Sequence, residues 1–305
     1  MLDVLLLLLT LALGALLARV SLCAVAGMQQ AVTARNYAGL ERLLIAASGA
    51  GVSLLLLAGL RPDQVWLPHD APFHAGIIVG GLLLGIGAMV NGGCYLGSVL
   101  YLGTGNLNFL FTLAGIGLGL RAAAAWTPLP RIATPGLSMA MGTLWLMGLG
   151  LFALIIAVLI YHRRITGQWL ALLAGLVAGL VYARQPGWSY GSTLEALAQG
   201  RLAIAQWRGE LSALGLFAGA IGGAVLAGQF RLQPLTPWRA LRCLCGGAIL
   251  GYGAALIPGG NDGLLLWSIP GLTLYGAAAY ALMLGIIGLG FALVERSTRR
   301  PPVAR

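Results

Sequence analysis

Residues 80–97 read GGLLLGIGAMVNGGCYLG, and the same glycine pattern returns at residues 246–263 as GGAILGYGAALIPGGNDG. Six glycines match between the two stretches at a constant offset of 166 residues, without a gap. Glycine is frequent here, at 47 of 305 residues, but six matches at one offset are difficult to obtain by chance. The sequence therefore predicts an internal repeat in which each copy holds an apolar segment interrupted by a glycine-rich break.

The composition restricts the class of protein. The chain is 59% hydrophobic and only 9% charged, whereas a soluble domain has roughly a quarter charged residues. Long apolar runs between short polar stretches are typical of helical membrane proteins. A transmembrane β-barrel requires alternating polar and apolar residues, and the run at residues 43–60, LLIAASGAGVSLLLLAGL, does not alternate. We therefore expect an all-α, polytopic membrane protein.

Nine apolar segments are candidates for transmembrane helices, and the third and eighth contain the two glycine-rich breaks. The stretch at residues 19–42 is too polar to span a membrane and too apolar for a free loop, so we expect a short re-entrant helix there. The nine segments are residues 3–18, 43–60, 76–102, 106–122, 138–160, 168–184, 210–229, 243–270 and 273–294.

Charge predicts the orientation. The net charge of +10 comes from scattered arginines, which indicate topology rather than a nucleic-acid partner. Twelve of the 18 arginines share one side of the membrane, which places the C-terminus in the cytoplasm and the N-terminus outside. Those twelve lie in the loops at residues 19–42, 161–168 and 230–242 and in the tail at residues 295–305.

Five spans separate the equivalent starts of the two copies, and an odd number inverts the second copy relative to the first. Residues 1–125 are then the first inverted repeat, and residues 168–305 are the second repeat with a cytoplasmic tail. Residues 126–167 form a connecting transmembrane segment and a cytoplasmic loop. Inverted repeats with helices broken near the membrane midplane are typical of transporters.

The breaks are the candidate solute path. A helix that restarts after a break exposes backbone N–H groups, which can hold an anion without a full charge. An acid near the midplane is costly and usually marks a pathway, which draws attention to Asp262. The alternative is that the glycines only permit close packing of helices. The predicted path-lining residues are Asn91, Gly92, Gly93 and Cys94 at the first break and Gly259, Gly260, Asn261 and Asp262 at the second.

The four cysteines fit no zinc template, and we expect free thiols. A thiol is a weak, polarizable donor that suits a transient site for a soft anion, although Cys94 can equally be a small packing residue. Cys23 lies between two arginines, and Cys243 and Cys245 are interpreted as packing residues.

Arginines near the predicted mouths are further candidates. Arg35 and its repeat equivalent Arg201 can attract anions at each mouth, or serve only as topology or lipid-contact residues.

Two motifs carry a resemblance to a known family. The first is the early R-x-S-x-C element, Arg19 to Cys23, and the second is GGLLLGIGAMVNGGCYLGSVLYLGTGNL with its repeat GGAILGYGAALIPGGNDGLLLWSIPGLTL. Together they resemble the YeeE/YedE family of sulfur-transport membrane proteins. The resemblance implies thiosulfate uptake across a bacterial inner membrane, along cysteines that line an hourglass-shaped molecule. Cys23 and Cys94 match two such positions, and a cytoplasmic sulfurtransferase is an implied partner.

The chain departs from the family pattern at the second break. The family usually has Gly-Cys-Asn there, whereas this chain has Gly259-Gly260-Asn261, followed by Asp262. The departure implies either another sulfur solute or a path that works with two thiols.

We therefore expect a permease for a small sulfur-containing anion, and thiosulfate is the first candidate for that anion. We expect membrane lipid around the protein and no cofactor or metal. No ATP-binding P-loop is present, so transport is expected to be passive or driven by consumption of the solute. One alternative is a membrane thiol carrier or enzyme that forms a persulfide on Cys23 or Cys94, although no histidine nearby can act as a base. The other is a structural subunit without a solute path.

Overall fold

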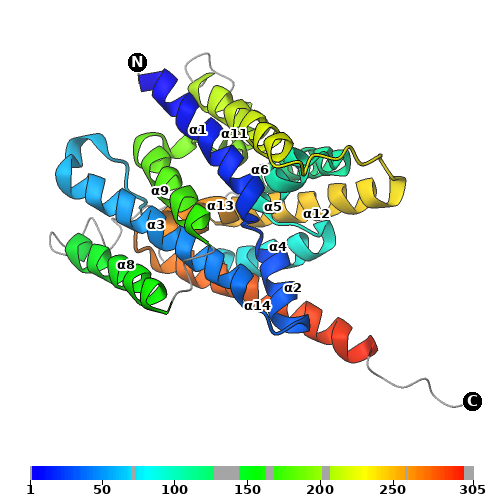
Figure 1. Ribbon diagram of the computed structural model, residues 1–305. Helices are drawn as coiled ribbons and strands as arrows, with labels where there is room; N and C mark the ends of the chain where they lie inside the picture. The colour runs from blue at the N-terminus through cyan, green and yellow to red at the C-terminus, as the bar shows by residue number, and fades with distance from the viewer. Residues whose placement is uncertain are drawn as a thin grey trace, which may run out of the picture.

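The computed structural model describes residues 2–69, 73–126, 144–162, 168–200, 207–257 and 260–298 (Figure 1). Every named element in these ranges is a helix, as the apolar runs predict. Two predicted site residues, Gly259 and Arg201, lie outside the described residues.

The first copy consists of six helices, and two short 3₁₀ turns lie in its loops. The turns are η1 (Pro62–Gln64) and η2 (Leu107–Phe109). The helices are α1 (Leu2–Val20), α2 (Ala24–Thr33), α3 (Ala38–Leu60), α4 (Ala75–Asn91), α5 (Tyr95–Gly103) and α6 (Leu110–Trp126).

Helix α8 (Leu144–Tyr161) precedes the second copy, which has the same order of elements. Its last broken helix consists of α13 (Asn261–Gly263), which continues into the π-helical turn η5 (Leu264–Ser268). The other elements are α9 (Trp169–Arg184), η3 (Pro186–Trp188), α10 (Tyr190–Ala198), α11 (Trp207–Leu226), α12 (Pro237–Leu256) and α14 (Leu274–Thr298).

The offset of 166 residues relates the two copies helix by helix. It carries the first residue of α2, Ala24, onto the first residue of α10, Tyr190. It likewise carries Tyr95, which begins α5, onto Asn261, which begins α13. The repeat seen in the glycine motifs therefore extends over all six helices of the copy, and α8 lies between the copies.

The helices of the two copies exchange contacts in pairs. Helix α1 packs along α11 and α3 packs along α9, while α4 packs against its own equivalent, α12 (Figure 1). The contacts are reciprocal at the level of residues. A Cβ on Gly87 would meet the backbone N of Leu250 at 2.7 Å, and a Cβ on its equivalent, Gly253, would meet the backbone N of Leu84 at 3.1 Å. Such exchange of equivalent contacts is what a two-fold relation between the copies requires.

Glycines permit these close contacts between helices. A Cβ on Gly175 of α9 would overlap the carbonyl oxygen of Ala46 in α3, and a Cβ on Gly219 of α11 would overlap that of Leu11 in α1. Small residues allow backbones to approach closely inside membranes, where apolar burial alone does not drive helix association. Glycines therefore permit close helix packing between α3 and α9 and between α1 and α11.

The apolar helices correspond to the nine expected spans. The described residues contain five helices long and apolar enough to cross a membrane, or six if the pair formed by α12 and residues 261–268, bent by 57°, is one span. Three shorter apolar helices, in α8, α9 and α11, lie at the positions of the remaining expected spans but do not reach that length. A short helix, α2, is present within residues 19–42, but its expected re-entrant course is not found. Helix α2 continues the course of α1 beyond a break at residues 21–23, and together they form one apolar stretch from Asp3 to Thr33 (Figure 1).

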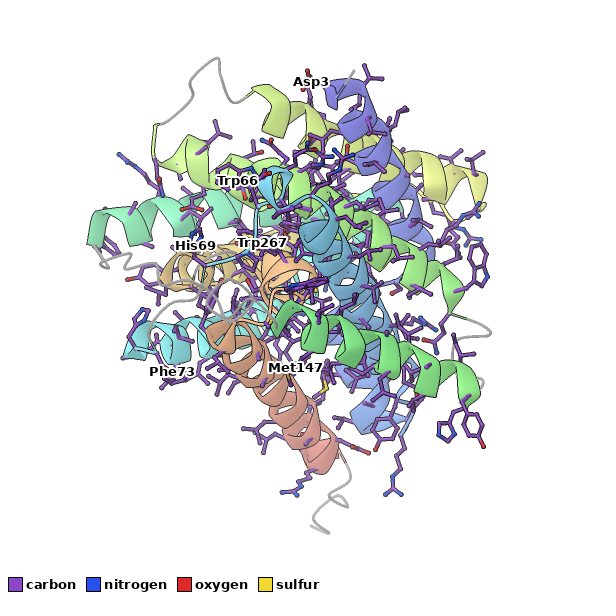
Figure 2. The ribbon with its side chains drawn as sticks, turned by 90° about the vertical axis from the view of Figure 1, so that its left-hand side faces the viewer. Asp3, Trp66, His69, Phe73, Met147 and Trp267 are labelled. Carbon is purple, nitrogen blue, oxygen red and sulfur yellow. The ribbon has the colours of Figure 1, made fainter. Side chains whose placement is uncertain are left out.

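Large apolar side chains cover much of the outer surface, as a lipid environment requires. Met147 on α8 and Phe73 before α4 are exposed (Figure 2). The loop that follows α3 is held against the second copy, because Trp267 Nε1 donates a hydrogen bond to the Trp66 carbonyl over 3.3 Å (Figure 2).

Candidate solute path at the helix breaks

Four helices begin at breaks. The residues that precede their first turns form two pairs, and the offset of 166 residues relates the members of each pair. Cys23 precedes α2 and Ser189 precedes α10, whereas Cys94 precedes α5 and Gly260 precedes α13. Each of these helix starts exposes backbone N–H groups and carries partial positive charge. The fold thus provides a favourable setting for an anion without a buried cation.

The first break is shaped by Gly92 and held by Asn91. Gly92 adopts a left-handed conformation, with φ of 74°, that favours glycine. Asn91 Nδ2 donates to the Gly93 carbonyl over 2.6 Å, and Thr112 Oγ1 donates to Asn91 Oδ1 over 2.6 Å. Ser98 Oγ also lies 3.4 Å from Asn91 Nδ2. Asn91 therefore holds the break in place, because both polar atoms of its amide are hydrogen-bonded within the protein.

The two thiols predicted from sequence lie side by side. The Sγ atoms of Cys94 and Cys23 are 4.0 Å apart, and the two residues are 0% and 1% exposed. The distance is that of contacting free thiols, since a disulfide requires about 2.05 Å. A Cβ on Gly97 would lie 2.6 Å from Cys23 Sγ and 3.7 Å from Cys94 Sγ, so the missing side chain at position 97 makes room for the pair.

The two breaks are joined directly. Asn261 Oδ1 accepts a hydrogen bond from the Tyr95 backbone N–H over 2.9 Å, and these two residues are equivalents, 166 apart. The bond therefore links the starts of α5 and α13 where the copies meet. The Asn261 side chain also lies next to the Cys94 thiol, and its Nδ2 atom has no hydrogen-bond partner among the described residues.

Asp262 lies directly beside position 260, where it would crowd any side chain. A Cβ on Gly260 would lie 2.7 Å from Asp262 Oδ1 and 3.0 Å from the ring of Tyr95. Asp262 is 4% exposed, and the Ser189 hydroxyl is next to its carboxyl group. Where the first copy has two thiols, the second copy has a hydroxyl and a carboxyl group.

Buried aromatic residues surround this second break, and sequence reasoning did not select them. The rings of Tyr95 and Tyr190 are 5.7 Å apart, and those of Tyr182 and Trp188 are 5.2 Å apart. Tyr190 Oη donates to the Tyr95 carbonyl over 2.9 Å. One signal was available, since Tyr95 and Tyr190 directly follow the residues that cap α5 and α10.

Arg239 of α12 is a cation near the first break. The sequence indicates it only as one of the arginines that mark the orientation. A Cβ on Gly92 would lie 3.0 Å from Arg239 Nη2, and the guanidinium lies over the Phe109 ring at 5.4 Å. Arg242 Nε donates to the Val90 carbonyl over 3.3 Å. Arg35, by contrast, is exposed beyond the end of α2.

Two hollows differ in their relation to the breaks. A small cavity of about 20 Å³ is lined by Tyr95, Gly191, Ser192, Glu195 and Gly260, with two apolar neighbours. A larger open groove of about 520 Å³ lies between α6 and α10, away from the thiols.

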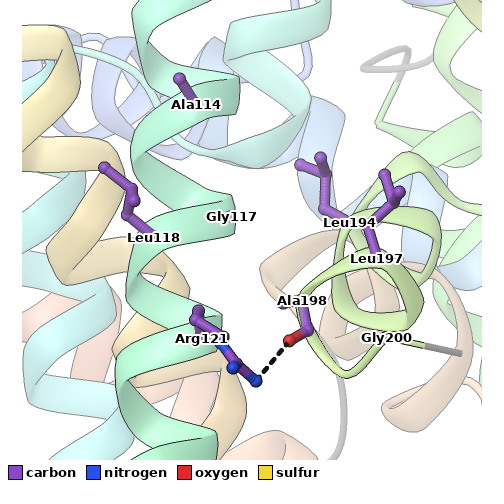
Figure 3. Close-up of a pocket in the computed structure, with 8 residues that line it drawn as sticks. All are labelled: Ala114, Gly117, Leu118, Arg121, Leu194, Leu197, Ala198 and Gly200. Atoms are coloured by element: carbon purple, nitrogen blue, oxygen red, sulfur yellow. Dashed lines mark hydrogen bonds between the residues drawn. The ribbon is translucent and has the colours of Figure 1, made fainter.

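The larger groove is mainly apolar, and its one charged side chain is occupied. Arg121 Nη1 donates to the Ala198 carbonyl over 3.3 Å, at one end of the groove (Figure 3). No residue of the breaks lines this groove. We therefore place the candidate path at the breaks and not at the larger hollow.

Comparison with known proteins agrees with the motifs. A family model described as sulphur transport matches residues 19–171 and 138–289, ranges that include all four breaks. A protein named thiosulfate transporter TsuA, from Spirochaeta thermophila, is 30% identical over 238 aligned residues. The alignment covers 65% of this chain and 71% of that relative.

Proposed function

Because this chain belongs to the sulphur-transport family, we propose that it is a permease that carries thiosulfate across the membrane past the Cys23–Cys94 pair. The observation that carries the proposal is the contact of these two thiols at 4.0 Å, between the starts of α2 and α5. The thiosulfate relative supports the choice of solute.

The chemistry of the pair suits a soft anion that must leave again. A full positive charge would bind a divalent anion tightly and slow its release, whereas helix starts offer only partial charge. Thiols add weak, polarizable donors. Backbone and thiol together therefore provide a site that replaces part of the solute's hydration without trapping it.

We extend the proposal to the arrangement in the membrane. Residues 1–125 and 168–305 are the two inverted repeats, joined by residues 126–167, in a bacterial inner membrane with the N-terminus outside. Arg239 and Arg242 then lie at the cytoplasmic mouth, next to the first break. The apolar outer surface contacts lipid, and the mouth is where a cytoplasmic sulfurtransferase would receive the solute.

The persulfide-forming enzyme is the weaker candidate. The family and the relative are both described as transporters, and neither description includes a catalytic activity. A permease is therefore the function that the family and the relative support better.

The test is uptake of radiolabelled thiosulfate into cells that lack their own sulfate and thiosulfate importers. We expect uptake by the wild type and a loss of at least about tenfold in Cys94→Ala, because one of two contacting donors is removed. Protein in the membrane fraction is quantified so that rates are compared at equal amounts.

Cys245→Ala is the matched control, since Cys245 is an exposed thiol on α12. Its uptake should equal that of the wild type. An inactive wild type would overturn thiosulfate as the solute, and a fully active Cys94→Ala would remove the thiol pair from the path.

A further inference from the structure

Asp262 is a buried acid at the second break, outside the Cys23–Cys94 pair. Its side chain is 4% exposed, and the polar groups next to its carboxyl are two backbone N–H groups, its own and that of Gly263, and the Ser189 hydroxyl. Among the described residues, no cation forms an ion pair with it. A buried carboxylate without a cation is costly, and inside a membrane such residues usually belong to a pathway for ions or protons.

The surroundings of Asp262 contain buried donors that lack acceptors. Tyr95 Oη and Trp188 Nε1 have no hydrogen-bond partner among the described residues. Tyr182 Oη and Asn261 Nδ2 make no hydrogen bond of good geometry there, although they interact with the Ser189 hydroxyl and the Cys94 thiol. A Cβ on Gly263 would lie 3.7 Å from Tyr182 Oη, which places that hydroxyl at the second break. Buried donors are nearly always paired in native proteins, so several unpaired ones beside one break indicate a ligand that accepts hydrogen bonds.

An anion among these donors would meet the Asp262 carboxyl group. Asp262 Oδ1 lies 2.7 Å from where a Cβ on Gly260 would be, and position 260 is the equivalent of Cys94. An ionised carboxylate at this place repels a divalent anion, because buried like charges are weakly screened. A protonated carboxyl is neutral and becomes one more donor.

We infer that Asp262 takes up a proton when the anion occupies the second break, so that the protein moves the anion and a proton together. The proton binds the carboxylate from the side at which the anion arrives, and it leaves to water on the other side when the anion does. No covalent bond of the solute is broken. The inference rests on the proposed permease and names its driving force, the proton gradient.

The titratable groups that face Asp262 are tyrosines, so Asp262 is the group among them suited to carry that proton. Tyr95 from α5, Tyr182 from α9 and Tyr190 from α10 act on it electrostatically and are neutral phenols near neutral pH. Glu195 of α10 acts on Tyr95 and lines the small cavity at Gly260. Glu195 is half-buried, and its carboxylate accepts a hydrogen bond from Gln199 Nε2 over 2.9 Å, so it is a second carboxyl group near the second break.

The test uses the purified full chain in lipid vesicles that contain a pH-sensitive dye, with the membrane potential held at zero by potassium and valinomycin. Labelled thiosulfate and interior pH are followed together, and protein-free vesicles give the background. We expect the interior to acidify as thiosulfate enters. A gradient of one pH unit, acid outside, should accumulate thiosulfate up to about tenfold for one proton per anion.

Asp262→Asn should lose both acidification and accumulation while it still equilibrates thiosulfate down its own gradient. Asp63→Asn, at an exposed acid in η1, is the control and should behave as the wild type. Wild-type uptake without acidification or accumulation would overturn the inference and leave the permease intact. Persistent proton movement in a folded Asp262→Asn would also overturn it, and absence of any thiosulfate uptake by the wild type would overturn the permease itself.

Discussion

Gly97 is the residue that allows the two thiols to meet. It lies in the first turn of α5, and a Cβ there would be 2.6 Å from Cys23 Sγ, a distance that real Cβ atoms do not tolerate. The Cys23 side chain is enclosed, so it can move only by disturbing its neighbours. The absence of one methyl group therefore determines whether the Cys23 thiol can lie beside Cys94.

We predict that Gly97→Ala lowers thiosulfate uptake by on the order of tenfold or more, because it displaces the Cys23 thiol from the path. The helix should remain, since alanine is a better helix former than glycine by roughly 0.5–1 kcal/mol. Gly117→Ala is the control, as nothing lies within 4 Å of a Cβ on Gly117. Equal uptake by both variants, measured at matched expression, would contradict a role for the thiol contact.

At the scale of elements, α12 covers the end of α4 with positive charge. Arg239 and Arg242 are three residues apart and so share one face of α12. Arg242 donates to the Val90 carbonyl in the last turn of α4, where the helix end is partially negative. Arg239 lies at Gly92, with its guanidinium over the Phe109 ring. The two arginines thus differ, since Arg242 stabilises a helix end and Arg239 faces the break.

We predict that Arg239→Gln raises the KM for thiosulfate about fivefold, because a half-buried cation near the path contributes on the order of 1 kcal/mol to anion binding. The effect should shrink at high salt, which screens the charge. Uptake rates over a range of thiosulfate concentrations provide the measurement. Arg296→Gln, an exposed arginine in the last turn of α14, should leave KM unchanged. The same KM in both variants would exclude Arg239 from the mouth.

At the scale of the whole molecule, the two similar copies place chemically different groups at their breaks. The half around Cys23 and Cys94 has thiols, and the half around Ser189 and Asp262 has a hydroxyl, a carboxyl group and unpaired donors. Uptake of a divalent anion into a cell with a negative interior is opposed by about 2.3 kcal/mol per charge per 100 mV. The proton that we propose to move with the anion would offset half of this cost, which gives the difference between the two breaks a use in uptake.

The inverted arrangement of the copies can be tested by labelling. The offset carries Asp63, in η1 after α3, onto Gln229, in the loop after α11, and both residues are exposed. In a Cys245→Ala background, we predict that an impermeant maleimide labels Asp63→Cys in intact spheroplasts. Gln229→Cys should be labelled only after the membrane is opened. Labelling of both from the same side would contradict the inverted topology, and retained thiosulfate uptake serves as the check on folding.

Apolar runs and glycine spacing in the sequence were sufficient to predict an all-α membrane protein, the positions of its helices and both glycine-rich breaks. These features are local, since span length follows membrane thickness and a break follows from residues such as Gly92 that leave the helical conformation. The offset of 166 residues likewise follows from the sequence alone, and it pairs the two glycine-rich breaks and Arg35 with Arg201.

Only the tertiary structure decided which residues meet. Cys23 and Cys94 are 71 positions apart, and Tyr95 and Asn261 are 166 apart, so their contacts depend on the packing of whole helices. The same packing directs the Asn91 amide to Gly93 and Thr112 and brings Arg239 to Gly92, and the sequence indicates neither contact. It also showed that Asp262 fills the space beside Gly260. Periodicity specifies where a helix lies along the chain, whereas the functional constellation arises from side chains of four helix starts that converge in space.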